Sequence, residues 1–149
     1  MTMAGADSYL FQVKRSEEFN ALRWHDSKCS SIRLDSGENS HDLVLEVDLL
    51  EVGKGNLRRP HTLKLLGCTY LEASLDLDGK RIVGGSLASA SCDVSSPWKD
   101  ALQKKLEHEK ANSLAPYLHF RVLFIHPGGE INVLAKDFAL VEEAAGASS

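Results

Sequence analysis

The sequence predicts an α+β fold, in which a mainly antiparallel, twisted sheet of about six to seven strands is accompanied by two helices. Asp42–Val52 alternates apolar and polar residues over a long run, the period of a half-buried strand. Tyr117–His126 and Ile131–Val141 alternate in the same way around a Pro-Gly-Gly-Glu turn, which indicates a hairpin. Two further segments begin with a serine that can cap a helix. Closure of the sheet into a barrel is an open alternative.

The amino-terminal part predicts a short helix that leads into the first strand. Ser16 can cap the helix, with two glutamates following at its positive end. We expect this helix to carry Phe19 and Leu22 inward, with Trp24 close behind. Ser31–Asp35 then alternates as a strand.

The middle of the chain predicts more strands. Thr62–Leu66 is an apolar run, and Leu71–Leu77 alternates with acidic residues and serine. Asp78-Gly79 indicates a tight hairpin, because glycine accepts a positive φ. A short strand is expected at Arg81–Val83.

The second helix is expected to start at Ser96-Pro97, with serine as the cap and proline in the first helical position. Trp98, Leu102 and Leu106 share one side, so this helix, expected to be the longer one, should pack on the sheet. The whole chain, residues 1–149, is expected to form a single domain, with an ordered core over about 9–142 and a frayed carboxyl-terminal tail.

Composition and charge exclude several classes of protein. Seventeen Lys and Arg against 21 Asp and Glu give a net charge of −4, and basic pairs such as Arg58-Arg59 are too short to build a phosphate-binding face. Nucleic acid and membrane are therefore not expected as partners. The three cysteines are far apart and form no CxxC pair, which fits a reducing compartment. With no apolar run long enough for a signal peptide or a membrane span, a cytoplasmic location is expected.

The residues carry no recognisable catalytic or metal-binding motif. His25, Asp26 and Ser27 contain the three residue types of a hydrolase triad, but neighbours in sequence cannot form the required relay. We interpret them as a structural junction between the first helix and the first strand. The six histidines form no HxH, HxxxH or HExxH pair. We therefore expect no catalytic residues, no metal and no cofactor.

Two surfaces are candidates for binding. The first is an acidic face that would attract a basic protein if the strands carrying it were paired; it comprises Glu46, Asp48, Glu72 and Asp76. A solvated face would look the same. The second is a pocket between the sheet and the second helix, lined by Trp98, Tyr117, His119 and Arg121.

Three segments together resemble a family of small bacterial proteins. They are residues 24–35 (WHDSKCSSIRLD), residues 42–52 with 61–77, and residues 117–140. Over about residues 16–142, the chain resembles immunity-type proteins of polymorphic-toxin systems and their relatives with a Trp-His-Asp-Ser segment. The resemblance implies a compact cytoplasmic α+β domain that binds and neutralises one cognate toxin without catalysis.

We therefore expect a non-enzymatic protein-binding domain, of the immunity type where the resemblance holds. The alternative is a small-ligand-binding β-sheet protein, or a minor enzyme, that uses the pocket beside the second helix. A homodimer through an edge strand of the last hairpin is a third expectation.

Overall fold

A computed structural model describes residues 5–38, 40–50, 57–75, 86–108, 113–125 and 128–143. Over these ranges the chain forms two helices and eight strands, all paired antiparallel, which confirms the α+β class. Sheet 1 has the order β1 (Lys28–Ser36), β2 (His41–Leu50), β3 (Arg58–Leu66) and β8 (Asp137–Glu142). Sheet 2 has the order β4 (Tyr70–Leu75), β7 (Gly129–Ala135), β6 (Leu118–Phe124) and β5 (Leu87–Asp93). The helices are α1 (Gly5–Asn20) and α2 (Pro97–His108).

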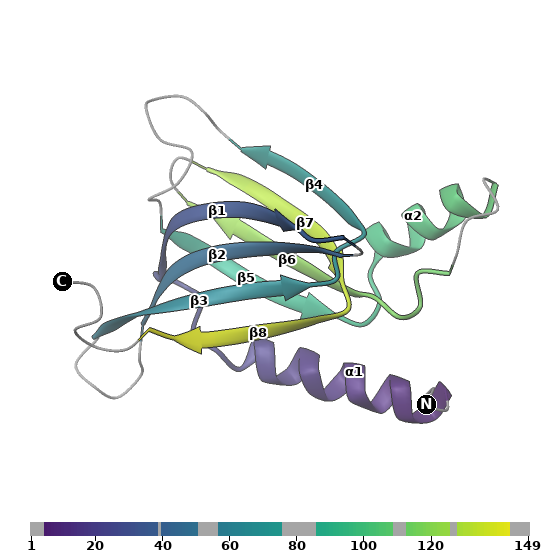
Figure 1. The fold of residues 1–149 in the computed structure, drawn as a ribbon, viewed down its shortest axis with the longest axis horizontal. Helices are drawn as coiled ribbons and strands as arrows, with labels where there is room; N and C mark the ends of the chain where they lie inside the picture. The colour runs from purple at the N-terminus through teal and green to yellow at the C-terminus, as the bar shows by residue number, and fades with distance from the viewer. Residues whose placement is uncertain are drawn as a thin grey trace.

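The two sheets lie one behind the other and enclose a single main core (Figure 1). Alternate residues of each strand face inward, as the period of two predicts. Leu45 and Leu63 of sheet 1 meet Phe120 and Val133 of sheet 2, and all four side chains are fully buried. The alternation predicted over Tyr117–His126 is confirmed in β6, where Leu118, Phe120, Val122 and Phe124 are all buried.

The sheets are joined at a corner where two connections, from β3 to β4 and from β7 to β8, pass from one sheet to the other side by side. Gly67 leads from β3 into β4 with φ +64°, and Lys136 separates β7 from β8. The Lys136 amide donates to the Leu66 carbonyl at 2.8 Å, and the Thr69 amide donates to the Leu134 carbonyl at 2.9 Å. The predicted single strand Ile131–Val141 is therefore two strands that belong to different sheets.

The prediction of six to seven strands, with a barrel as an option, is wrong in both respects. The larger number has two causes: the break at Lys136 divides one predicted strand into β7 and β8, and the sequence pattern did not indicate β5. Opposite the corner, the described parts of the two sheets are linked by an isolated bridge between Lys28 and Ser86 and not by a ladder of paired strands, so they do not close into a barrel. The hairpin at Asp78-Gly79 and the strand at Arg81–Val83 fall outside the described residues.

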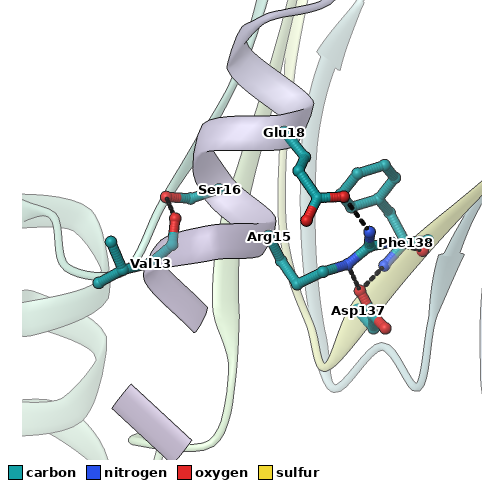
Figure 2. Close-up of polar contacts among 6 residues, drawn as sticks. All are labelled: Val13, Arg15, Ser16, Glu18, Asp137 and Phe138. Carbon is teal, nitrogen blue, oxygen red and sulfur yellow. Dashed lines mark hydrogen bonds and ion pairs between the residues drawn. The ribbon is translucent and has the colours of Figure 1, made fainter. Parts of the chain in front are cut away.

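The first helix is longer than predicted and starts earlier. Ser16 does not cap α1 but lies in its last turns, where its hydroxyl donates to the Val13 carbonyl at 3.0 Å (Figure 2). With 16 residues against 12, α1 and not α2 is the longer helix. The start was missed because Tyr9, Leu10 and Phe11 are consecutive and exposed, so no apolar stripe marks these turns. Phe19 and Trp24 do face the core, as predicted.

Arg15 fastens α1 to the edge of sheet 1. Its guanidinium lies 4.0 Å from the centre of the Phe138 ring, donates to the Phe138 carbonyl at 2.6 Å and to Asp137 Oδ1 at 2.8 Å, and bonds Glu18 Oε2 at 2.8 Å (Figure 2). The last hairpin therefore does not offer a free edge in the way expected for a homodimer: β7 is interior, and the β8 edge is in contact with Arg15.

The same helix covers the edge of sheet 2. The Asn20 side chain donates to the Cys92 carbonyl at 2.9 Å and accepts from the Cys92 amide at 2.8 Å, in the manner of a neighbouring strand. Figure 1 shows α1 running beside β8, with α2 at one end of the strands. No helix in the described part of the chain is long and apolar enough to cross a membrane.

Candidate functional site

The outer side of sheet 2 gathers most of the predicted pocket residues. His119 and Arg121 point outward from β6, while their neighbours in β6 face the core. Trp98 reaches the same side from the first turn of α2. Tyr117 precedes β6 and packs, together with Trp98, against a second, smaller hydrophobic cluster that contains Leu106 and Leu134.

A continuous row of hydrogen bonds crosses this outer side. We call it the polar row; its members are Ser96, His119, Asn132, Glu130 and Arg121. His119 bonds Ser96 Oγ through Nδ1 and Asn132 Oδ1 through Nε2, both at 2.7 Å. Asn132 Nδ2 donates to Glu130 Oε2 at 2.6 Å, and Arg121 donates to Glu130 Oε1 at 2.8 Å. Every side chain of the row is thereby held in one orientation.

The row fixes the tautomer of His119. Because the Asn132 amide nitrogen donates to Glu130, the amide oxygen faces His119 and can only accept. His119 Nε2 therefore carries the proton, and Nδ1 accepts from the Ser96 hydroxyl. Burial lowers the pKa of His119, and the bond to Asn132 offsets only part of that effect. The imidazole is neutral around pH 7.

Glu130 is the charged centre of the row. The hydrogen bond from Arg121, followed by the one from Asn132, lowers the pKa of its carboxyl group. Its two oxygens are thus both engaged, and the carboxylate cannot rotate freely. The negative charge of Glu130 is therefore held at a fixed place on the outer side of sheet 2.

Two of the residues predicted to line a pocket between the sheet and α2, Trp98 and His119, pack against each other. The Trp98 ring lies on the His119 ring, with centroids 4.6 Å apart, and His119 is only 3% exposed. The capped start of α2 brings Trp98 directly over the imidazole, with the Lys99 amide donating to Ser96 Oγ at 3.1 Å.

A hollow does exist beside the polar row, but none of the four predicted pocket residues lines it. It measures about 320 Å³ and is lined by Glu72, Ser74, Leu123, Gly129, Glu130 and Asn132. Glu72 stands opposite Asn132, and Ser74 opposite Glu130, in the β4–β7 ladder. Two carboxylates therefore face one shallow depression.

The predicted acidic face is divided between the two sheets. Glu46 and Asp48 lie on β2 in sheet 1, whereas Glu72 lies on β4 in sheet 2, so the pairing that would unite them does not occur. Glu46 is engaged by Arg33 at 3.2 Å and by the Thr62 hydroxyl at 3.0 Å. Asp76 lies outside the described residues.

His25, Asp26 and Ser27 lie where the first helix meets β1. Ser27 is fully buried; its hydroxyl donates to the Arg23 carbonyl at 2.8 Å and accepts from the Leu50 amide at 3.1 Å. Asp26 has a φ of +66°, and its amide donates to the Leu87 carbonyl at 3.0 Å. His25 Nδ1 lies 2.9 Å from the Ala88 carbonyl and can donate to it. All three take part in holding the chain at this junction.

Ser96, His119 and Asn132 have the connectivity of a catalytic triad, but their surroundings differ from one. The serine oxygen already accepts an amide hydrogen bond as the helix cap, and Trp98 covers the imidazole. The hollow lies over Glu130 and Asn132, at the other end of the row. In the described residues no group of three or more His, Cys, Asp or Glu side chains is arranged to hold a metal ion. Burial raises the pKa of Cys29 and Cys92 to about 12, which makes these thiols unreactive.

Sequence reasoning missed Ser96 as a partner of His119, and missed Glu130 and Asn132 altogether. The last two do carry a signal: they alternate on β7, and once the hairpin register is set Asn132 falls opposite Arg121, with Glu130 two residues away on the same side. Ser96 carries none, because its contact with His119 joins positions 23 residues apart. Lys99 was also missed; its ammonium group donates to the carbonyls of Val94 and Tyr117 at 2.8 and 2.7 Å.

Comparison with known proteins adds no relative: no family model, curated protein or solved structure matches this chain.

Proposed function

We propose that this chain is a non-enzymatic domain that binds a basic protein partner, of the kind that its resemblance to immunity-type proteins suggests. The observation that carries the proposal is the polar row with the adjoining hollow on the outer side of sheet 2. Glu130 is held by Arg121 and Asn132, and Glu72 faces the same depression from β4.

A prearranged carboxylate suits the recognition of a basic side chain. The Glu130 carboxylate is already fixed, so little side-chain freedom is lost when a partner binds. Opposite charges across an interface also speed the encounter of two proteins. A lysine or arginine of the partner would enter the hollow between Glu72 and Glu130.

The state of His119 favours binding over catalysis. A general base needs an unprotonated nitrogen that a reacting group can reach, and the unprotonated Nδ1 of His119 faces Ser96, whose oxygen caps α2. Trp98 also separates the ring from the solvent side. The row then serves to hold Glu130 and Arg121 in place rather than to move protons.

The test is quantitative capture of a cognate partner from the protein's own cell extract, at moderate and high salt. Glu72→Lys should abolish capture and shift the melting temperature by no more than a few degrees, because Glu72 makes only a 3.4 Å contact with Trp98 Nε1. Glu17→Lys is the matched control, because Glu17 is exposed on α1 and changes the net charge equally. Loss of capture with Asp48→Lys but not with Glu72→Lys would transfer the site to sheet 1 and refute this assignment.

A second candidate function is the binding of a small cationic ligand, because a hollow of about 320 Å³ reaches the lower end of the range seen for ligand sites. In that case the purified protein would show a rise in melting temperature with such a ligand, and Glu72→Lys would remove it. A screen of amines and metal ions that never moves the transition, together with a captured protein, would favour the first candidate.

A further inference from the structure

In the described part of the chain, α1 covers two edges of the sandwich, and the edge of β1 is paired only at its start, where Lys28 bridges to Ser86. The edges of β8 and β5 are held by Arg15 and Asn20 of α1. The edges of β1 and β4 lie on the opposite side, and neither helix runs along β1 (Figure 1). An uncovered edge strand presents backbone groups that can pair with another strand.

The open side exposes residues that belong to the core-facing side of the sheets. Leu34 stands opposite Leu43, and Leu71 stands opposite Val133; both partners are core residues. Residues that stand opposite each other in a ladder share a face. Yet Leu34 is 52% exposed and Leu71 is 47% exposed, and both line a small depression of about 150 Å³.

The peptide groups of Leu34 point away from β2. The hairpin between β1 and β2 is closed by the Gly37 amide, which donates to the Ser40 carbonyl at 2.8 Å. Bonded and non-bonded positions alternate along an antiparallel ladder. Counting back from Gly37, the backbone N–H and C=O groups of Asp35 and Arg33 bond to β2, whereas those of Leu34 face the open edge.

We propose that the occupant of this edge is a second copy of the chain, paired antiparallel through β1 about a twofold axis at Leu34. In this register Leu34 stands opposite Leu34 of the second copy, and Arg33 stands opposite Asp35 of the second copy, twice over by symmetry. Arg33 and Asp35 are both exposed, and they already attract each other within one strand at 3.3 Å. The edge is therefore complementary to itself in charge.

The register also agrees with the irregularity of β1. The bulge lies between Cys29 and Ser31, and the ladder to β2 is regular from Ser31 to Ser36. A bulge disturbs pairing, so the regular half is the part that can accept a strand. Joining two copies there extends sheet 1 across both molecules and places Leu34 and Leu71 beside the apolar side of the second copy.

Exchanging the two charges tests this pairing by sedimentation or light scattering as a function of concentration. The wild type should approach twice the monomer mass of 16.3 kDa. Arg33→Asp places aspartates opposite each other and should weaken self-association at least about tenfold. The double variant Arg33→Asp/Asp35→Arg restores complementary pairs and should restore the dimer.

Lys64→Asp is the matched control, because Lys64 is exposed on β3, inside the same sheet, and undergoes the same change of charge. It should dimerise as the wild type does. Both variants lose the contact between Arg33 and Glu46 within one chain. A dimer that returns in the double variant would therefore show that Arg33→Asp acts on pairing and not on folding. A monomer at every concentration, or a dimer indifferent to Arg33→Asp, would overturn the proposal.

A pair of cysteine variants reads the register independently of charge. With Leu34→Cys the two new thiols lie on directly opposite residues, about 5.5 Å apart between Cα atoms, within the range of a disulfide. With Ser36→Cys they lie about 13 Å apart, because Ser36 stands opposite Ile32 of the second copy. Mild oxidation should cross-link the first variant and not the second. Equal cross-linking of both would contradict this register.

Discussion

At the residue scale, His119 shows how one buried side chain can organise a surface. Its imidazole joins the cap of α2 to the β7 side chains, through bonds of 2.7 Å on each nitrogen. These bonds satisfy a ring that is almost completely buried, and an unsatisfied buried polar group would destabilise the fold. The position of Glu130, and with it the charge presented to a partner, follows from this ring.

The pKa of His119 makes stability depend on pH in a defined direction. Burial lowers the pKa in the folded state, so the unfolded chain binds the proton first as pH falls below the ordinary value of 6.5. This contribution to stability is complete above that value and is lost as pH falls through it toward the folded pKa, by at most about 1.4 kcal/mol per pH unit. Urea unfolding at pH 7.5 and 5.5 should show the loss in the wild type and a smaller one in His119→Gln. The same substitution at exposed His25 should leave the loss unchanged.

At the scale of elements, α1 acts as a cover for two sheet edges at once. Arg15 contacts β8 through a ring contact and a carbonyl, and Asn20 contacts β5 through both the nitrogen and the oxygen of its side-chain amide. The sequence predicted that Phe19 faces inward, because apolar spacing reports burial. It did not predict the bonds of Arg15 and Asn20, because these depend on which strands end beside the helix.

Arg15 should therefore be sensitive even to a conservative change. Lysine keeps the charge but lacks the planar group that lies on Phe138 while it bonds Asp137 and the Phe138 carbonyl (Figure 2). We expect Arg15→Ala to lower the free energy of unfolding by about 1.5–3 kcal/mol, and Arg15→Lys to recover less than half of the loss. Denaturant titrations measure both. Lys14→Ala, at an exposed neighbouring position, should change stability by less than about 0.5 kcal/mol, and a comparable loss there would show that helix propensity dominates.

At the scale of the whole molecule, the alternation of apolar residues predicted the strands but not their distribution over two sheets. Ile131–Val141 keeps its alternation on both sides of Lys136, so the bend leaves no trace in the pattern. β5, rich in serine and alanine, lacks the large apolar residues that would indicate a strand. Because alternation does not tell which sheet a strand belongs to, the acidic residues of β2 and β4 could not be assigned to separate faces. The residues of the candidate site could likewise be found only in part.

The corner at Gly67 connects the two sheets, because the chain passes there from β3 of sheet 1 to β4 of sheet 2. Its φ of +64° is unfavourable for a residue with a side chain, although a Cβ there would make only an ordinary contact, at 3.4 Å, with Lys136 Cδ of the other connection. Gly67→Ala should therefore destabilise the protein by roughly 1–2 kcal/mol, and Gly67→Asn by less, because asparagine tolerates this conformation better.

Because the main core is shared by both sheets, this loss should reach the whole molecule in one transition. Trp24 packs on Phe19 in the main core, and Trp98 lies on His119 over the outer side of sheet 2, so the two tryptophans report on different places. In variants that keep only one tryptophan, Gly67→Ala should lower both melting temperatures equally. Gly37→Ala is the control, since a Cβ there makes only ordinary contacts at 3.7 Å and should leave both unchanged. Two separate transitions in the Gly67→Ala protein would mean that the sheets fold independently and that the corner merely links them.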